Sequence, residues 1–347
     1  MKVVTCRASD QPLVVEERPL PQPGPGEVLL RIRSCGVCGS ELHMGHGPRR
    51  DFPGGLVMGH EYAGEVVTLG EGVSGLSEGQ LVALYPAVGC GQCPACARGN
   101  AILCPSARRL LGGFAEYACI PASAAVPLPR GLGPADGALV EPLAVSFYGA
   151  KAAGIRGGER VLVLGAGSIA LAAMFWARRM GAGRIVAMSR SPRRAELALA
   201  MGADAFITYG YSECEEVVAA LGGAPDIVFE CVGAEGMLGR AIAHAATFGR
   251  VISLGLSRQP ESVDALAAGM KDLTLRFPVG YSRADFREVA TTMLDGPVDP
   301  KCMISRVVPL EDLPQAFADL LGNHGETKVM VDPTLSAGSG YVGVKPW

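Results

Sequence analysis

The sequence predicts an α/β fold in which a β-rich domain is followed by a doubly wound parallel sheet. Residues up to about 150 are dense in glycine, proline and cysteine and carry short β-type runs such as Val28–Ile32 and Gly64–Val67. From about Gly158 the pattern changes to apolar strands that alternate with helices, which is typical of parallel crossover units. We therefore expect two domains of different class.

The second domain begins with the fully apolar strand Val161–Leu164, and a helix follows it to about Met180. Another helix is expected from Pro192 to Met201, closed by Gly202. The remaining strands of this domain are expected at Arg184–Met188, Ala205–Thr208, Asp226–Glu230 and Arg250–Leu254.

The chain changes character once more after about Arg283. Val307–Pro309 and Lys328–Val331 have the composition of strands, and we expect them to rejoin the first domain. The expected ranges are 1–150 for the β-rich domain, 151–283 for the parallel-sheet domain, and 284–347 for the return to the first domain and a C-terminal tail.

Composition and charge exclude several classes of protein. Hydrophobic residues make up 49% and charged residues 19% of the 347 residues, as in a globular chain of about two domains. A net charge of -3 argues against a general nucleic-acid binder, which would show a basic face. The apolar stretch Val161–Ala177 contains two glycines and is a little short for a membrane span. Eleven cysteines without a secretory signal indicate a reducing compartment, and we expect a cytoplasmic protein.

Four cysteines lie close together, at Cys90, Cys93, Cys96 and Cys104, in a turn-rich lobe of about residues 86–106. Four thiolates at this spacing can surround one tetrahedral metal ion and leave no coordination position for a substrate. The sequence therefore predicts a structural zinc site. A loop of unpaired or disulfide-bonded cysteines is the alternative, which the spacing disfavours.

The sequence GAGSIA forms a G-x-G-x-x-A motif between an apolar strand and a helix. Gly165 makes the tight turn, Gly167 lets the backbone approach a pyrophosphate, and Ala170 is small enough for close packing of helix and strand. The phosphates would lie at the helix N-terminus, beside Ser168 and Ile169, where free N–H groups favour anions. The motif predicts a dinucleotide site, with a glycine turn that serves only packing as the alternative.

The end of the second strand indicates which dinucleotide binds. An NAD site normally has an acidic residue there, roughly 20 residues after the glycines. This chain has Ser189 and Arg190 instead, followed by Arg194. A carboxylate would repel a 2′-phosphate, whereas serine and arginine would bind it with charge-assisted hydrogen bonds. We therefore expect a preference for NADP(H) over NAD(H); the alternative is that these arginines only solvate the start of a helix.

Two upstream clusters contain further candidate metal ligands. Cys38 lies in CGVCGSELH, and His60 precedes Glu61 in GHEY. They offer one thiolate and one imidazole, to which Glu61 or Glu141 could add a carboxylate. Three protein ligands and one open position are what a catalytic zinc ion needs. Each residue alone could be a core cysteine, a satisfied histidine or a surface acid, but their presence beside the other two motifs favours a second zinc site.

Seven motifs extend over nearly the whole chain: GVCGSELH, GHEYAGEVV, the four-cysteine lobe, GGFAEYA at 112–118, VEPLAV at 140–145, VLVLGAGSIA, and FECVG at 229–233. On these motifs the chain resembles the zinc-dependent alcohol dehydrogenases of the medium-chain dehydrogenase/reductase superfamily, most closely their polyol branch of sorbitol- and threonine-dehydrogenase-like enzymes. The resemblance implies a GroES-like catalytic domain, a Rossmann domain, two zinc ions per chain, Val232 among the cofactor contacts, and a homo-oligomer, either a dimer or a tetramer.

The resemblance also implies roles at matching positions. Cys38 and His60 would bind the catalytic zinc ion, and Glu61 would be a permanent or an exchangeable ligand. Glu141 would be a direct or water-mediated ligand in the place of the second cysteine of the family's common set, as in the polyol branch. Glu41 stands where the family commonly has aspartate, and its carboxylate would orient His60. Which glutamate binds zinc in the resting protein stays open.

The implied reaction is hydride transfer between a secondary alcohol or polyol and the dinucleotide, with a ketone or aldehyde as the oxidised product. Zinc would lower the pKa of the substrate hydroxyl, Ser40 would receive its proton, and His43 would pass the proton to solvent. Glu61 completes the expected catalytic set. Alternatively, Ser40 is only a turn residue and His43 only a surface residue.

Two other functions are compatible with the fold. A zinc-independent quinone or enoyl reductase would lack the cysteine lobe and the Cys38–His60 pair. A non-catalytic structural protein that binds NADP would be expected to have lost a ligand or a relay residue, whereas this chain has all of them. A metal assay separates the first alternative from the zinc enzyme.

Overall fold

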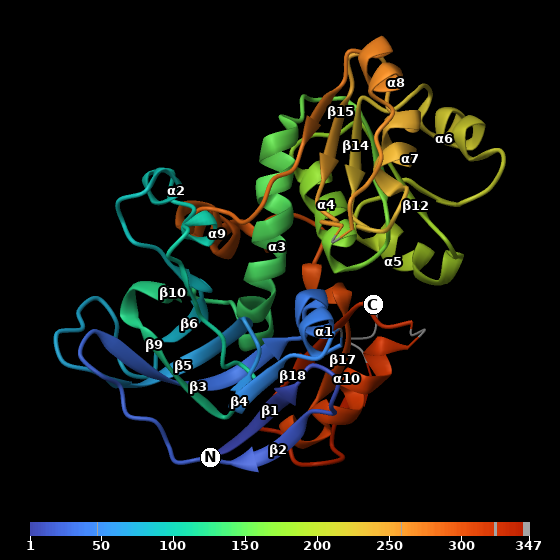
Figure 1. Ribbon diagram of the computed structural model, residues 1–347. Coiled ribbons are helices and arrows are strands. Elements are labelled where there is room, and N and C mark those ends of the chain that lie inside the picture. The colour runs from blue at the N-terminus through green and yellow to red at the C-terminus, as the bar shows by residue number, and fades with distance from the viewer. Residues whose placement is uncertain (47, 258, 323–324, 343–347) are drawn as a thin grey trace. The chain divides into compact units, whose positions relative to one another are not determined.

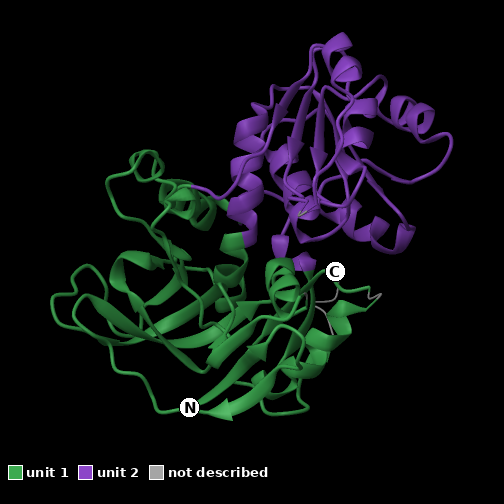
Figure 2. Cartoon of the chain, in the orientation of Figure 1, with its two compact units in different colours: residues 1–141, 282–293, 304–347 green, residues 142–281, 294–303 purple. Residues whose placement is uncertain are grey.

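The computed structural model describes residues 1–46, 48–257, 259–322 and 325–342. The chain forms two compact units, coloured green and purple in Figure 2. The first unit contains residues 1–141, 282–293 and the chain from 304 onward; the second contains residues 142–281 and 294–303.

The first unit is built mainly from antiparallel β-sheet. Its strands are β1 (Lys2–Ala8), β2 (Val14–Glu17), β3 (Glu27–Gly36), β4 (Asp51–Val57), β5 (Glu61–Leu69), β6 (Leu81–Leu84), β7 (Ala87–Val88), β8 (Arg108–Arg109), β9 (Tyr117–Pro121), β10 (Ala125–Pro127), β17 (Ile304–Val308), β18 (Lys328–Val331) and β19 (Tyr341–Val342). The main sheet has the order β10-β6-β5-β3-β18-β17-β19, with β9 also on β3. A smaller sheet has the order β2-β1-β4, and β7 pairs with β8.

Short helices connect these strands. They are α1 (Gly39–Gly45), α2 (Pro94–Ala97), α9 (Arg283–Thr292), α10 (Leu313–Leu321), and the 3-10 helices η1 (Ala101–Leu103), η2 (Ala122–Ala124) and η5 (Leu310–Asp312). Strand β3 is central, because its alternate residues Val28, Leu30 and Ile32 are fully buried in the core. The carboxyl end of β3 leads into α1 and lies between β5 and β18.

The second unit is a parallel sheet with the order β13-β12-β11-β14-β15-β16. Its strands are β11 (Arg160–Leu164), β12 (Arg184–Ser189), β13 (Ala205–Thr208), β14 (Ile227–Glu230), β15 (Arg250–Ser253) and β16 (Thr274–Arg276). Its helices are α3 (Pro134–Ala153), α4 (Ser168–Arg179), α5 (Ala195–Ala200), α6 (Glu213–Leu221), α7 (Met237–His244), α8 (Ala265–Met270), η3 (Pro192–Arg194) and η4 (Pro300–Met303). Figure 1 shows helices on both faces of this sheet, with α6 and α7 on the face that contains Leu162 and Val186.

The predicted α/β class and the doubly wound parallel sheet are confirmed. The five strands expected in the parallel sheet are present within one residue at each end, and β16 was not predicted. In the first unit, the strand expected at Val307–Pro309 begins earlier, at Ile304, and ends at Val308. The stretch Val161–Ala177 consists of β11 followed by α4. None of the helices in the described part of the chain is long and apolar enough to cross a membrane.

The unit boundaries differ from the ranges expected from the sequence. Helix α3 continues through Pro142, and its residues from that proline onward belong to the second unit rather than the first. Residues 294–303 also pack with the second unit, through η4 against α4 and α5. The sequence patterns could not locate either exchange, because contacts with distant elements decide both.

The C-terminal tail contributes a strand. Tyr341 and Val342 form β19, which pairs antiparallel with β17 at the end of the main sheet. The amide of Gly338 donates to Asp312 at 3.1 Å and fixes the turn that precedes this strand. The part of the tail after 342 lies outside the described residues.

Candidate functional site

The four cysteines expected to bind structural zinc converge, and the sulfur atoms of Cys90, Cys93, Cys96 and Cys104 lie within 4.8 Å of one another. All four are free thiols. Cys93 caps α2 and its sulfur accepts from the Cys96 amide at 3.5 Å, while the Cys104 sulfur accepts from the Cys90 amide at 3.3 Å. Amides of Gln92 and Cys93 lower the pKa of the Cys90 thiol to about 6, which favours the thiolate that binds metals. Four sulfurs around zinc lie about 3.8 Å apart when each Zn–S bond is about 2.3 Å, so this donor set fits.

Helix α1 and strand β5 hold a second cluster of donors. Cys38 directly precedes α1, His60 directly precedes β5, and Glu61 begins β5. One donor atom from each of these residues lies within 4.8 Å of the other two. Gly36 pairs with Glu61 across the sheet, and a Cβ there would lie 2.2 Å from Glu61 Oε2. Glycine at this position therefore allows the chain that leads to Cys38 to pass beside the carboxylate.

Glu41 orients the His60 ring. Its buried carboxylate lies 2.7 Å from His60 Nδ1, and it accepts from the amides of Gly59 at 2.9 Å and Cys38 at 3.0 Å. An ionised carboxylate only accepts, so Nδ1 carries the proton and Nε2 is left for a metal ion. Burial opposes the charged ring, but the negative charges of Glu41 and Cys38 outweigh it and raise the pKa of His60 well above its usual value. The same charges would attract a metal cation.

Lys328, which the sequence analysis did not single out, lies against this cluster. Its Nζ donates to Glu61 Oε1 at 2.9 Å, to Glu61 Oε2 at 2.6 Å and to the Val37 carbonyl at 3.1 Å. Burial opposes the ammonium form, but the charges of Glu61, Cys38 and Glu141 outweigh it and raise the pKa of Lys328. The signal in the sequence was a lysine at the head of the otherwise apolar strand KVMV.

The remaining predicted catalytic residues differ in their proximity to this cluster. Ser40 Oγ donates to the Cys38 sulfur at 3.3 Å. His43 lies three residues further along α1, and residues at this spacing share one helix face. Both side chains are exposed. Glu141, in α3, is 7% exposed and does not belong to the group of described donors that lie within 4.8 Å of one another.

The glycine motif of the second unit has the expected strand–turn–helix setting. Gly165 has φ +109°, where only glycine is unstrained, and its amide donates to the Met188 carbonyl at 2.7 Å. Gly167 directly precedes α4, and a Cβ there would meet nothing within 4 Å. The backbone before Ser168 and Ile169, the first residues of α4, is thus open to a ligand such as a pyrophosphate.

Polar and cationic side chains gather where β12 ends. Ser189 is the last residue of β12, and Arg190 after it is exposed. The Arg194 guanidinium donates to the Ala166 carbonyl at 3.2 Å, inside the glycine motif. Val232, in the loop after β14, is 41% exposed, and its Cγ2 would lie 3.2 Å from a Cβ on the first glycine of the motif. Arg194 and Val232 therefore both lie beside the glycine turn.

Tyr209 and Arg240, which the sequence analysis did not single out, lie near the end of β12. The Tyr209 amide donates to the Ser189 carbonyl at 3.1 Å, so the loop after β13 lies against the end of β12. The Arg240 guanidinium lies 4.2 Å from the centre of the Tyr209 ring. Burial raises the pKa of Tyr209 to about 12, so the phenol remains a hydrogen-bond donor. Nothing in the local sequence separates this tyrosine from a packing residue.

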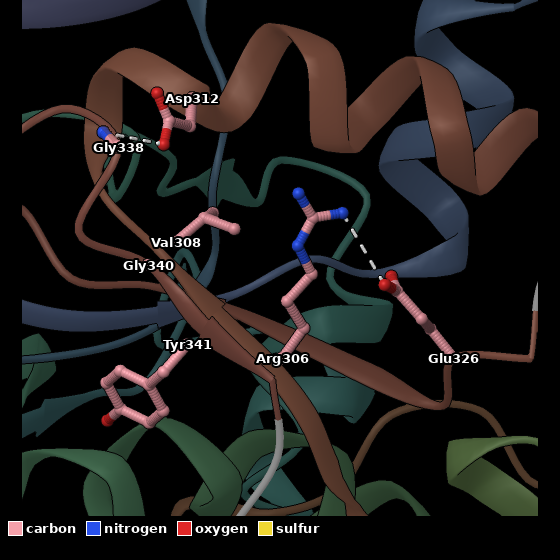
Figure 3. A pocket seen from close by; sticks show the side chains of 7 residues that line it. All are labelled: Arg306, Val308, Asp312, Glu326, Gly338, Gly340 and Tyr341. Carbon is pink, nitrogen blue, oxygen red and sulfur yellow. Dashed lines mark hydrogen bonds and ion pairs between the residues drawn. The ribbon is translucent and has the colours of Figure 1, made fainter.

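A cavity of about 330 Å³ lies beside the C-terminal strand (Figure 3). It is lined by Arg306, Val308, Asp312, Glu326, Gly338, Gly340 and Tyr341. Arg306 forms ion pairs with Glu326 at 3.5 Å and with Asp319 at 3.2 Å. The cavity contains none of the predicted site residues, and we assign it no part in catalysis.

Comparisons with known proteins agree with this arrangement. Residues 24–130 match a family model described as the alcohol dehydrogenase GroES-like domain, and residues 168–295 match one described as zinc-binding dehydrogenase. These matches confirm the predicted GroES-like domain and the dehydrogenase class of the second domain.

Individual relatives extend over nearly the whole chain. Sorbitol dehydrogenase of Gallus gallus is 33% identical and covers 96% of this chain and 97% of its own. L-galactonate-5-dehydrogenase of Escherichia coli (strain K12) is 30% identical over 93% of this chain and 96% of its own. A crystal structure from Sinorhizobium meliloti 1021, of a protein assigned as a zinc-binding dehydrogenase and bound to NADP, is 30% identical with a TM-score of 0.85, covering 96% of this chain and 100% of its own.

Proposed function

The chain belongs to the zinc-dependent alcohol dehydrogenases of the medium-chain dehydrogenase/reductase superfamily, in their polyol branch, and we propose that it transfers hydride between NADP(H) and a secondary alcohol or polyol. One observation carries the proposal: donors of Cys38, His60 and Glu61 lie within 4.8 Å of one another, with the His60 ring already oriented by Glu41. A zinc-independent reductase or a structural protein would not need three metal donors held this close together.

We assign Cys38, His60 and Glu61 as the ligands of the catalytic zinc ion, and the four clustered cysteines as those of a second, structural ion. Glu61 is favoured over Glu141 because only Glu61 belongs to the close group. Its carboxylate has lone pairs enough for Lys328 and a metal ion together. Bound zinc would act as a Lewis acid that lowers the pKa of the substrate hydroxyl. An anionic carboxylate ligand lowers the Lewis acidity of a zinc ion. Because the positive charge of Lys328 offsets the negative charge of Glu61, we expect Glu61 to lower it less than an unpaired carboxylate would.

The side chains of α1 would then move the proton. Ser40, beside Cys38, accepts it from the substrate hydroxyl, and His43, exposed one turn further along the helix, carries it to solvent. The nicotinamide ring supplies the hydride acceptor.

NADP(H) is the proposed cofactor because β12 ends at Ser189 and is followed by Arg190, with no carboxylate at this place. The Tyr209 amide donates to the Ser189 carbonyl, and Arg194 bonds the glycine motif. The Sinorhizobium relative binds NADP, which agrees with this choice. We further propose a cytoplasmic homo-oligomer, a dimer or a tetramer, which light scattering tests.

The decisive experiment measures zinc content together with kcat/KM for a panel of alcohols, polyols and ketones, using both cofactors. We expect two zinc ions per chain and a higher kcat/KM with NADP(H). Full turnover by protein without zinc would refute the metal assignment, and a clear advantage of NAD(H) would refute the cofactor assignment.

A further inference from the structure

Arg240, on helix α7, is a cation to which the proposed reaction gives no role. Its guanidinium lies 4.2 Å from the centre of the Tyr209 ring, and its Nη1 pairs with Glu213 Oε2 at 3.2 Å. The side chains of Arg240 and Glu213 are 34% and 12% exposed. A guanidinium that contacts an aromatic ring and a carboxylate at once is held in one place by both. Arg240 therefore joins Tyr209 and Glu213.

Glu213 connects Arg240 to the loop that follows β13. It is the first residue of α6, and its Oε2 also accepts from the Gly210 amide at 3.0 Å. Its Oε1 lies 3.3 Å from Nε2 of His244, which is on α7. Burial lowers the pKa of His244, so at neutral pH the cation of this group is Arg240. Since Gly210 directly follows Tyr209, these contacts fix the backbone of the tyrosine loop against α7.

The Tyr209 phenol lies at the edge of the sheet where the adenosine half of the dinucleotide is expected. The Tyr209 amide donates to the Ser189 carbonyl at 3.1 Å. Burial raises the pKa of Tyr209 to about 12, and the charges of Glu230 and Arg190 act on the phenol in opposite directions. Glu230 ends β14 and Arg190 follows β12, so both stand at the carboxyl ends of strands. Dinucleotides bind along this edge of a doubly wound sheet.

The Tyr209 hydroxyl is a hydrogen-bond donor that no protein group uses. It keeps its proton at neutral pH, and none of the residues that the structure describes is bonded to its oxygen. A half-buried hydroxyl that the protein leaves unsatisfied is available to a ligand. Near Arg190, the ligand group that suits such a donor is an anion, and the 2′-phosphate is the anion expected there.

We propose that Arg240 is a positioning residue for the 2′-phosphate of NADP(H), and that it acts by holding the Tyr209 phenol where the phenol donates to this phosphate. The inference rests on the proposed function and adds two residues to its cofactor site. It predicts a selective defect, because a ligand without the 2′-phosphate makes no use of the phenol. Loss of Arg240 weakens adenosine ligands that carry the 2′-phosphate and spares those that lack it.

Calorimetric titration of the full chain with 2′,5′-ADP and with 5′-AMP tests this selectivity, because the two ligands differ only in the 2′-phosphate. Arg240→Met keeps a long side chain against the ring but removes the charge. It is expected to raise the Kd of 2′,5′-ADP about tenfold and to leave that of 5′-AMP within about twofold. The matched control is Arg184→Met, which removes an exposed cation from the amino end of β12 and should alter neither Kd.

A second variant shows whether Arg240 acts through the phenol. Tyr209→Phe keeps the ring beside the guanidinium and removes only the hydroxyl, so it should weaken the binding of 2′,5′-ADP and not that of 5′-AMP. In the double variant Tyr209→Phe/Arg240→Met the loss should be no larger than in Tyr209→Phe, since the two residues serve one contact. Losses that add in full would show that Arg240 acts on the phosphate by its own charge, and they would overturn the positioning role.

The affinities of the wild-type chain separate this inference from the proposed function. If wild type binds 2′,5′-ADP more tightly than 5′-AMP, an equal loss for both ligands in Arg240→Met, or no loss for either, overturns the inference alone. A wild-type chain that binds the two ligands equally, or binds neither, refutes the NADP(H) proposal and this inference together. Should Arg240→Met not fold, Arg240→Lys keeps the charge but not the planar group, and it must show the same split as Tyr209→Phe.

Discussion

Lys328 Nζ lies 2.6 Å from Glu61 Oε2 inside the first unit, where the two side chains are only 3% and 2% exposed. Strand pairing creates this contact, because β3 has β5 on one side and β18 on the other. The Glu61 carboxylate lies within 4.8 Å of the Cys38 and His60 donors, and Lys328 offsets its negative charge. The ion pair therefore couples the fold of this unit to the charge of the proposed zinc site.

In metal-free protein, replacing Lys328 with methionine leaves the buried Glu61 carboxylate without a cation. Removing one partner of a buried pair costs about 3–5 kcal/mol, so we expect a large loss in the free energy of unfolding by urea. The double variant Glu61→Gln/Lys328→Met removes both charges and should recover much of that loss. Strictly additive effects of the two substitutions would show that the pair does not interact energetically.

Ser40→Ala removes the proposed proton acceptor without touching a metal ligand. We expect kcat to fall by about 10²–10⁴-fold, since this is the range for positioned proton transfer. Zinc content and the Kd of NADP⁺ should stay at wild-type values. Ser40→Thr, which keeps the hydroxyl, serves as the control and should retain much of the rate. A wild-type kcat in Ser40→Ala would assign the proton to another group.

Cys93→Ser should lower the thermal stability of the protein without lowering kcat. The variant is expected to lose one zinc ion per chain and to unfold at a temperature lower by roughly 5 °C or more, because a closed tetrathiolate site contributes folding energy. Protein that remains folded should keep kcat within about threefold, since a closed site takes no part in the reaction. The exposed Cys214, replaced by serine, is the matched control. Complete loss of turnover in folded Cys93→Ser would contradict a purely structural role.

The parallel sheet could be predicted from the sequence because its signals are local. Each strand is a short run of apolar residues bounded by turns and helices. A strand that is buried on both faces consists almost entirely of apolar residues, so its position can be predicted from the run alone. Helix α3 was missed for the opposite reason. Pro142 stands inside it and is read locally as a helix breaker, whereas packing of the helix in the folded chain overrides that preference.

The residues of the candidate site also fall into two groups, those that the sequence predicted and those that it did not. Cys90, Cys93 and Cys96 are close in sequence, so their spacing alone predicted a metal site, whereas Cys38 was proposed because it occurs beside the other motifs and matches the family pattern. Lys328 is 267 residues away from Glu61, and only the pairing of β18 with β3 brings the two together. The lysine at the head of an apolar strand is a local signal for Lys328, but nothing in the local sequence identifies Glu61 as its partner.

The acid sensitivity of the second unit should depend on Asp226. Its carboxylate accepts from the Arg160 guanidinium at 2.7 and 3.0 Å, and this pairing lowers the pKa of Asp226. The lowered pKa stabilises the fold fully above the unfolded-state pKa of about 3.9, and the stabilisation is lost as pH falls through the lower folded-state value. Asp226→Asn should therefore melt below wild type at pH 7, with a difference that shrinks below about pH 4. A difference that is constant with pH would exclude the ion pair as its source.

The preference for NADP(H) over NAD(H) should depend on the residues at the carboxyl end of β12. Arg190→Ala removes one cation from the proposed 2′-phosphate site, and a hydrogen bond to a charged group contributes about 1.5–3 kcal/mol, so kcat/KM with NADP(H) should fall by roughly tenfold to a hundredfold. The value with NAD(H) should hardly change, because NAD lacks the 2′-phosphate. Arg184→Ala, at the amino end of the same strand, is the matched control: it removes the same charge from the unit but at the edge of the sheet away from the dinucleotide. Equal losses with both cofactors would mean that Arg190 supports the fold of the loop and does not recognise the phosphate.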